Sequence, residues 1–358
     1  MPEQPPEPRG PRLRELGLRI GELDPGPTDS IADVDGARVG HVTVWRDEPD
    51  PPEGRGVART GVTAIVPEAF ETMARSPLPA GTAVLNGMGE LTGSIEIGDW
   101  GQLDTPVYLT ATMSVGRVYD GAAAVAVAAD PTVGVDRVIV PVVGECDDSW
   151  LNDARTPQFE VEDVARAVET ATAWPFAEGA VGAGTGMSCL GWKGGIGTAS
   201  RVVAGVGATV GALLLTNFGT GRQLRVAGVP VGRLLPPGGG RDSPAGSCIV
   251  VLATDAPLAP AQLSHLARRA GIGLGRTGST AHYGSGEIFI AFSTARDGDP
   301  VPDHELNGFF TAVIDATEEA VLNSLWAAPD VTGREGRVER GLPHEPVLEL
   351  LRERKVLD

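Results

Sequence analysis

The spacing of apolar and polar residues along the chain predicts short strands interspersed with longer helices. Short runs rich in Val, Ile and Leu that end at Gly, Pro or Asp are typical of strands. They lie at residues 31–34, 37–44, 61–66, 106–110, 136–143, 249–253 and 286–293. Apolar residues that recur at the period of an α-helix predict helices over residues 116–129, 161–173, 260–271 and 306–326.

Strand and helix patterns are mixed from one end of the chain to the other. Residues 202–217 form a long run of Val, Gly, Ala and Leu that ends at Thr216-Asn217. Gly-rich strands let two sheets approach closely, so we expect sheet packed on sheet. Neither an internal repeat nor a linker is visible. The sequence therefore predicts one α+β domain over residues 13–358, preceded by a Pro-rich, mobile tail at residues 1–12.

The composition is that of a globular protein, with 42% hydrophobic and 21% charged residues. Aromatic residues reach only 5%, so the core must be built mostly from Val, Ala, Leu and Ile. The formal net charge of −18 argues against nucleic acid as a partner. No apolar run has the roughly 18–20 residues of a membrane span. The N-terminus lacks the apolar stretch of a signal peptide.

The cysteines and histidines predict no metal site and no disulfide framework. Cys146, Cys189 and Cys248 are odd in number and show no CxxC spacing, which favours a reducing cytoplasm. The histidines do not fall at metal-ligand spacing. They are His41, His265, His282, His304 and His344.

Two glycine-rich segments resemble nucleotide-binding loops only superficially. Residues 182–186 lack the full GxGxxG frame, and residues 271–275 follow a predicted helix where the motif requires a strand. Lys193 is not followed by Ser or Thr, so it is not a P-loop lysine. Its pattern fits a structural lysine and a substrate-facing one equally well. We therefore expect no cofactor.

The most informative position is the Gly246-Ser247 peptide bond, hereafter the junction. A Gly/Pro-rich loop at residues 234–246 meets an apolar strand that begins at Ser247. A hydroxyl residue that opens a strand behind a pliable loop is a position where a chain can cleave itself. Cleavage there would place a free α-amine, with a pKa of about 8, within reach of the Ser247 hydroxyl. The same pattern is also typical of an ordinary turn.

Three further residues complete a candidate hydrolytic site. Ser285 and Glu287 are two positions apart in a predicted strand, so they project to one face and can relay a proton. Asn217, at the end of its run, carries an amide that can donate to an oxyanion. Taken alone, Ser285-Gly286-Glu287 is a common turn sequence, and Asn217 is more often a helix cap or a turn residue.

The chain resembles the L-aminopeptidase/D-esterase family, which includes the β-peptidyl aminopeptidases. The resemblance extends over nearly the whole chain and rests on many short motifs. The matching segments are residues 31–36, 39–41, 85–93, 141–145, 151–153, 184–187, 193–201, 246–247, 253–258, 276–278 and 285–287. The family implies a four-layer αββα sandwich that is similar to N-terminal-nucleophile hydrolases but differs in strand connectivity.

The resemblance also implies a function. Members are made as precursors that cleave before the serine, which here would give an α chain of residues 1–246 and a β chain of residues 247–358. Ser247 would be the nucleophile of a serine aminopeptidase or amidase, with Ser285, Glu287 and Asn217 assisting it. The substrates would be small peptides, amino-acid amides or esters. The family further suggests a homo-oligomer, with a tetramer suspected.

The resemblance assigns the substrate's free amine to Glu145, which would make the enzyme an exopeptidase. The chain departs from the family pattern just after Glu145, where members often have an aromatic residue with a hydroxyl group. Here the sequence reads Asp147-Asp148-Ser149-Trp150, so Trp150 would fill part of that space. Cys248, next to the nucleophile, should point to the opposite face of the strand.

Two alternatives remain open at this point. Ornithine acetyltransferases share the self-cleaving logic, but they carry Thr at the junction where this chain carries Ser247. A protein that kept the fold without catalysis is the other alternative, and the presence of all four predicted catalytic residues argues against it.

Overall fold

A computed structural model describes residues 7–241 and 246–357. Residues 1–6 of the expected tail and residues 242–245 of the loop before the junction lie outside the described residues. Within the tail, the Arg9 main-chain N–H donates to the Ala327 carbonyl at 2.9 Å. Arg12 forms an ion pair with Glu178 at 3.0 Å. The described part of the tail is therefore bonded to the body of the protein.

A six-stranded sheet forms the centre of the molecule, in the strand order β4-β3-β12-β11-β10-β9. Its strands are β3 (Leu78–Gly87), β4 (Gln102–Leu103), β9 (Ile196–Val203), β10 (Ala208–Asn217), β11 (Gly246–Thr254) and β12 (Ser285–Ser293). Strands β11 and β12 run parallel, while the other neighbours are antiparallel. The strand that begins at the junction therefore lies in the middle of the sheet.

A four-stranded sheet packs against the first, in the order β1-β2-β5-β6. Its strands are β1 (Arg38–Arg46), β2 (Ala58–Val66), β5 (Val107–Ala111) and β6 (Val142–Cys146). Two short hairpins stand apart from both sheets. They are formed by β7 (Ser188–Cys189) with β8 (Trp192–Lys193), and by β13 (Val331–Thr332) with β14 (Val338–Glu339).

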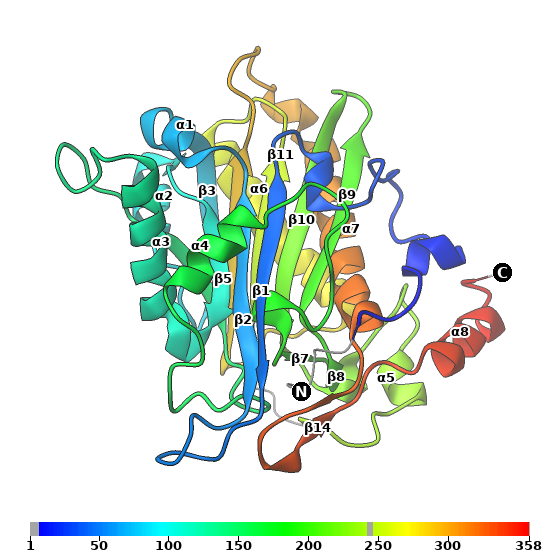
Figure 1. The fold of residues 1–358 in the computed structure, drawn as a ribbon. Helices are drawn as coiled ribbons and strands as arrows, with labels where there is room; N and C mark the ends of the chain where they lie inside the picture. The colour runs from blue at the N-terminus through cyan, green and yellow to red at the C-terminus, as the bar shows by residue number, and fades with distance from the viewer. Residues whose placement is uncertain (1–6, 242–245, 358) are drawn as a thin grey trace.

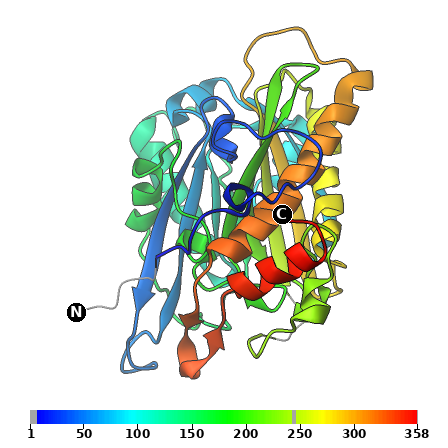
Figure 2. The ribbon, with the colours of Figure 1, turned by 90° about the vertical axis from the view of Figure 1, so that its right-hand side faces the viewer.

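Helices cover the outer face of each sheet (Figures 1 and 2). Helices α6 (Pro260–Thr277) and α7 (Leu306–Ala327) pack on the six-stranded sheet, and α3 (Val115–Ala129) and α4 (Glu162–Glu169) pack on the four-stranded sheet. The predicted four-layer αββα sandwich is confirmed. The shorter helices are α1 (Phe70–Arg75), α2 (Ser94–Trp100), α5 (Val231–Leu234) and α8 (His344–Glu353). Among the described residues, no helix is long and apolar enough to cross a bilayer.

The two faces of β11 contribute to different cores. Ile249 and Val251 lie in the apolar layer between the two sheets, whereas Cys248 and Val250 lie in the layer under α6 and α7. The strand is apolar at nearly every position because both of its faces are covered. Since side chains alternate along a strand, Ser247 projects toward the space between the sheets.

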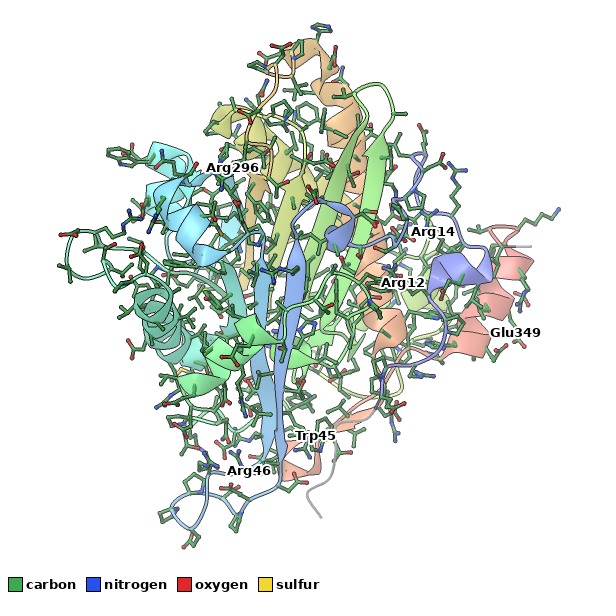
Figure 3. All side chains as sticks on the ribbon, turned by 45° about the horizontal axis from the view of Figure 1, so that its top comes forward. Arg12, Arg14, Trp45, Arg46, Arg296 and Glu349 are labelled. Carbon is green, nitrogen blue, oxygen red and sulfur yellow. The ribbon has the colours of Figure 1, made fainter. Side chains whose placement is uncertain are left out.

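Buried ion pairs fasten the N-terminal segment to α7. Arg201 is fully buried and contacts both Asp29, at 3.3 Å, and Glu319. Arg14 reaches the same two carboxylates, at 3.2 Å from Asp29 and 2.9 Å from Glu319. Figure 3 shows Arg12 and Arg14 on the N-terminal segment. Charges buried this deeply are tolerated because each one is paired.

Two expected strands differ in the structure, and one long apolar run divides into two strands. Residues 31–33 form a 3₁₀ helix capped by the Ser30 hydroxyl, which accepts from the Ala32 N–H. The strand expected at 136–143 begins only at Val142. Val135 and Val138, which precede it, are exposed, so β-branched residues here do not indicate a strand. The run 202–217 turns between β9 and β10. Residues 271–275 continue α6, which excludes a nucleotide loop there.

Candidate active site

Strand register gathers the predicted catalytic residues at one end of the six-stranded sheet. Ser247 pairs with Asn217 across the antiparallel β10–β11 ladder. On the other side, in the parallel β11–β12 ladder, Gly246 lies beside Ser285 and Cys248 lies beside Glu287. Three adjacent central strands therefore bring together residues that are up to 70 positions apart, between Asn217 and Glu287. This end of the sheet lies beside the β7–β8 hairpin (Figure 1).

Ser247 already contacts the carbonyl that it would attack. Its side chain is buried, and its Oγ donates a hydrogen bond to the Gly246 carbonyl oxygen at 2.7 Å. Gly246 is closely packed, because a β-carbon on it would lie 2.0 Å from the Asn217 carbonyl oxygen. The junction therefore has no room for any residue larger than glycine.

Replacing Gly246 by Ala is expected to slow cleavage at the junction by about 100-fold, since a misplacement of roughly 1 Å can cost that much in a positioned reaction. The added methyl group must push β11 away from β10 and thereby move Ser247 from its carbonyl. The measurement is a time course of intact and cleaved chain on a denaturing gel. Gly275→Ala is the control, because no atom lies within 4 Å of its added carbon. Maturation of Gly246→Ala at the wild-type rate would contradict the expectation.

Ser285 and Glu287 form a buried pair on the helix-facing side of the sheet. The Ser285 hydroxyl donates to Glu287 Oε1, while Glu287 Oε2 has no hydrogen-bond partner among the described residues. Burial raises the pKa of Glu287, and the Ser285 hydrogen bond opposes that rise. Register places the pair on the same face as Cys248, so it lies beside the main chain at the junction and not beside the Ser247 hydroxyl.

Asn217 is held in one orientation by bonds to both ends of its amide. Its Oδ1 accepts from the Ser188 main-chain N–H at 3.0 Å and from Arg241 at 3.3 Å. Its Nδ2 donates to the Asp147 carbonyl at 2.8 Å. The Ser188 main-chain N–H can only donate, so this bond alone fixes which end of the amide is the oxygen. Nδ2 has a second N–H in addition to the one that bonds to Asp147.

Glu145 reaches the same region from the opposite sheet, at the end of β6. It is buried, and its carboxylate accepts from the Glu90 main-chain N–H at 2.9 Å and from the Thr112 hydroxyl. A β-carbon on Gly89 would lie 3.0 Å from Glu145 Oε1 and 3.7 Å from the Gly286 Cα, beside Ser247. Burial raises the pKa of Glu145, and the two hydrogen bonds oppose that rise. A charged amine placed here would favour the carboxylate.

Trp150 lies at the edge of this group. Its ring packs with Trp45 against Leu151 and Val331, and the Arg337 guanidinium stacks on it at 4.6 Å. The structure therefore gives Trp150 a packing role. Its place as a substrate-binding residue remains a prediction, which rests on its position five residues after Glu145, where the family often has an aromatic hydroxyl.

Asp148 is buried, with one described partner for its carboxylate. Oδ1 accepts from Asn152 Nδ2 at 3.0 Å, and Oδ2 has no hydrogen-bond partner among the described residues. Burial raises the pKa of Asp148 to about 7. Since the unfolded value is about 3.9, the folded chain binds more protons between these two pH values. The stability that Asp148 contributes therefore falls as the pH rises from about 4 to 7.

Asp148→Asn is expected to remove this dependence and to stabilise the folded chain at alkaline pH. The difference in free energy of unfolding between this variant and the chain that keeps Asp148 should rise in favour of the variant by about 2–3 kcal/mol between pH 5 and pH 8. Urea unfolding at the two pH values measures this, in chains that also carry Ser247→Ala so that one unbroken polypeptide is compared. The exposed Asp297→Asn serves as the control. An equal advantage at both pH values would mean that the carboxyl group does not titrate as inferred.

Lys193 acts as a structural residue, which settles one of the alternatives left open by the sequence. Its side chain is fully buried, and Nζ donates to the carbonyls of Gly184, Met187 and Gly194 at 2.6–2.9 Å. Burial lowers the pKa of Lys193 to about 7. Three carbonyl acceptors nevertheless match the three N–H donors of the charged form. The ammonium group thus shapes the loop that presents the Ser188 N–H to Asn217.

The described cysteines and acidic groups provide neither a second nucleophile nor a metal centre. Cys146 and Cys248 are buried, and burial raises the pKa of each thiol well above its usual value, so both are inert. No group of three or more His, Cys, Asp or Glu in the described ranges is arranged to hold a metal ion.

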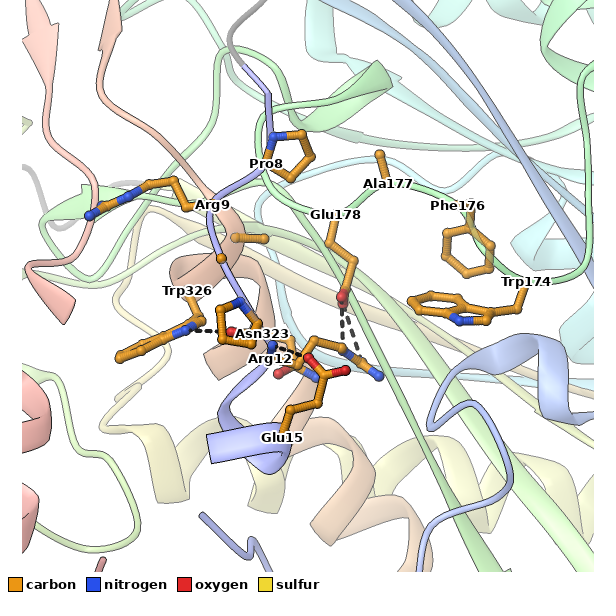
Figure 4. Close-up of a pocket in the computed structure, with 13 residues that line it drawn as sticks. Pro8, Arg9, Arg12, Glu15, Trp174, Phe176, Ala177, Glu178, Asn323 and Trp326 are labelled. Carbon is orange, nitrogen blue, oxygen red and sulfur yellow. Dashed lines mark hydrogen bonds and ion pairs between the residues drawn. The ribbon is translucent and has the colours of Figure 1, made fainter. Parts of the chain in front are cut away.

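A cavity of about 260 Å³ lies under the N-terminal segment, apart from these residues (Figure 4). Arg12, Glu178, Trp174 and Trp326 are among the residues that line it, and none of the predicted site residues does. Arg12 forms an ion pair with Glu178 there and also donates to the Asp29 and Thr198 carbonyls.

The chain is similar to known peptidases in both sequence and structure. Residues 29–339 match the model of peptidase family S58. The chain is 42% identical to beta-peptidyl aminopeptidase BapA of Sphingosinicella microcystinivorans, over 96% of this chain and 92% of that protein. It is 40% identical to a Burkholderia beta-aminopeptidase structure, with a TM-score of 0.87 over 96% of this chain and 99% of that one.

A third relative has a structure whose fold has been described. The L-aminopeptidase D-Ala-esterase/amidase of Ochrobactrum anthropi is 39% identical, with a TM-score of 0.89 over 98% of this chain and 100% of that one. That structure is described as a prototype of the serine aminopeptidases and as a new variant of the Ntn hydrolase fold.

Proposed function

This chain belongs to peptidase family S58, and from that premise we propose that it is an aminopeptidase that activates itself by cutting its own junction. It is a hydrolase of the serine aminopeptidase type, with aminopeptidase and amidase activity. The assignments of Ser247, Ser285, Glu287, Asn217 and Glu145 are part of the proposal. The observation that carries it is the Ser247 hydroxyl, which touches the Gly246 carbonyl oxygen at 2.7 Å.

Self-cleavage begins with attack of Ser247 Oγ on the Gly246 carbonyl carbon. The C–N bond of the junction breaks as an ester forms between the Gly246 acyl group and the Ser247 side chain, and the hydroxyl proton passes to the leaving nitrogen. Water then hydrolyses the ester. This step releases a carboxylate on Gly246 and returns the hydroxyl of Ser247, whose α-amine became free when the C–N bond broke. The second N–H of Asn217 stabilises the oxyanion of each tetrahedral intermediate.

Cleavage also changes what the Ser285–Glu287 pair faces. Ser285 lies beside Gly246 in the intact chain, so departure of Gly246 frees the space that the new amine of Ser247 can enter. The unpartnered Glu287 Oε2 provides the acceptor that fixes this amine or relays its proton through Ser285. The amine then acts as the base that removes the hydroxyl proton from Ser247 during turnover.

In turnover, the substrate's charged N-terminus binds Glu145 and its first carbonyl carbon lies over Ser247 Oγ. The nucleophile forms an acyl-enzyme and the amine of the next residue leaves with a proton. Water completes hydrolysis and returns the hydroxyl. Because Glu145 requires a free amine, the enzyme removes residues only from the N-terminus of small peptides, amides and esters.

We further propose that the enzyme works in the cytoplasm as a homo-oligomer. The three buried, free cysteines support a reducing compartment. Exposed apolar side chains along β3 and α2 support association between copies, with a tetramer as the expected size. They are Val84, Leu85, Met88, Ile95 and Trp100.

Two measurements on the purified protein test the proposal. Intact-mass spectrometry should find two fragments that end and begin at the junction. Amino-acid p-nitroanilides should be hydrolysed, while acetyl transfer to ornithine should not occur. An active preparation that consists of one unbroken chain would refute self-activation. Acetyl transfer without hydrolysis would show that the chain follows the ornithine acetyltransferases instead.

A further inference from the structure

The segment before the junction rests on a buried carboxylate from the far end of the chain. Glu339, in β14, is fully buried, and its Oε2 accepts from the Arg241 main-chain N–H at 2.9 Å. A β-carbon on Gly240 would lie 2.4 Å from Glu339 Oε1, so the main chain of residues 240–241 packs directly against this side chain. A hydrogen bond to a buried carboxylate is stronger than one between neutral groups.

The Arg241 side chain connects the same point to the catalytic residues. Its guanidinium donates to Asn217 Oδ1 at 3.3 Å and lies 3.7 Å from Asp147 Oδ2. The Arg241 side chain is only 12% exposed and Asn217 is buried, so the contact between them is largely shielded from water, whereas Asp147 is 46% exposed. One residue thereby links β14, the end of β10 and the loop after β6.

These contacts fix the chain on one side of the junction, and the strand fixes it on the other. Gly246 pairs with Ser285 in the β11–β12 ladder and packs against the Asn217 carbonyl. Only four residues separate Gly246 from Arg241. Anchoring both ends of so short a segment lowers the entropy that must be lost to hold the scissile carbonyl against Ser247.

We propose that Arg241 and Glu339 are positioning residues for self-cleavage that substrate hydrolysis does not use. The inference rests on the proposed function. After cleavage, Arg241 lies near the new end of the α chain, while the nucleophile begins the β chain. Asn217 keeps its orientation without Arg241, because the Ser188 N–H still donates to Oδ1 from the loop held by Lys193. The same contacts that speed maturation therefore have no task in the mature enzyme.

The test separates maturation from turnover in purified variants. Arg241→Ala should lengthen the half-time of self-cleavage by about tenfold, the size expected when a hydrogen bond to a charged group is lost. Arg241→Lys should recover part of the rate, and the isosteric Glu339→Gln should slow cleavage several-fold. Cleavage is followed by intact mass, and hydrolysis of an amino-acid p-nitroanilide is expressed per cleaved chain. That turnover should stay within twofold of wild type in every variant.

Glu335→Gln is the matched control, because Glu335 lies in the same hairpin region with an exposed side chain that pairs only with Arg334 and Arg337 among the described residues. It should mature and turn over normally. The proposal is overturned if Arg241→Ala and Glu339→Gln mature at the wild-type rate. It is equally overturned if turnover per cleaved chain falls in step with maturation, since both residues would then serve the site as a whole. A wild-type chain that is active without cleavage would sink the proposed function instead.

Discussion

Ser247→Ala is expected to yield one unbroken chain of 358 residues with no detectable hydrolysis. The change removes the oxygen that contacts the Gly246 carbonyl, so the ester of the first step cannot form. It also leaves the nitrogen of residue 247 in a peptide bond, where it cannot act as a base. Two requirements of turnover are lost together. The rate should therefore fall by at least about 10³-fold, as in other enzymes that lose their nucleophile.

Intact mass and p-nitroanilide hydrolysis measure both consequences in one preparation. Cys248→Ala is the matched control, because Cys248 is the next residue along the strand and its thiol lies in the core on the opposite face. This variant should cleave and turn over like wild type. Cleavage or hydrolysis that persists in Ser247→Ala would remove Ser247 from the mechanism altogether.

Glu145→Gln is expected to impair turnover severely while leaving maturation intact. The variant keeps the shape of the side chain and its contacts with the Glu90 N–H and the Thr112 hydroxyl, but it has no charge to pair with an amine. Loss of one partner from a desolvated charge pair costs about 3–5 kcal/mol. The kcat/KM for substrates with a free amine should thus fall by about 10²–10³-fold.

Self-cleavage involves no substrate amine, so the Glu145→Gln chain should still be cut at the junction. Esters of α-hydroxy acids, which lack the amine, should be hydrolysed slowly by wild type and at the same slow rate by the variant. Glu90→Gln serves as the control, because the Glu90 side chain is exposed and only its main-chain N–H reaches the site. If Glu145→Gln lost its activity toward both kinds of substrate alike, Glu145 would have a general role and not an amine-binding one.

The sequence predicted most of the layers because helices and buried strands leave strong periodic patterns. The predicted helix over 306–326 is α7 within one residue at its end, and the predicted strand at 286–293 is β12 with Ser285 added. The strand expected at 136–143 failed for a physical reason. β-Branched residues fit a strand only when neighbouring strands cover them, and composition alone does not show that Val138 lies in the open.

The site residues were found through short motifs, but their arrangement was not. Spacing indicated that Ser285 and Glu287 share a face, and the structure shows that they do. Which face they share depends on the register between β11 and β12, which no local pattern encodes. The sequence does not predict the contact between Arg241 and Glu339, because neither residue belongs to a recognisable motif and 98 positions separate them. Contacts of that kind follow only from the folded chain.

The order of strands in the central sheet has a consequence for the two pieces that cleavage would create. Strands β11 and β12, from the smaller piece, lie between β3 and β10, which both belong to the larger one. Neither fragment would contain the whole six-stranded sheet, so the cut enzyme would be an interleaved heterodimer whose subunits could not separate without breaking the β3–β12 and β10–β11 ladders. After denaturation the two fragments would have to associate in order to refold. Refolding would then be bimolecular, whereas refolding of the intact precursor is unimolecular. The intact precursor should then refold at a rate independent of its concentration, whereas recovery of the mature enzyme should slow on dilution.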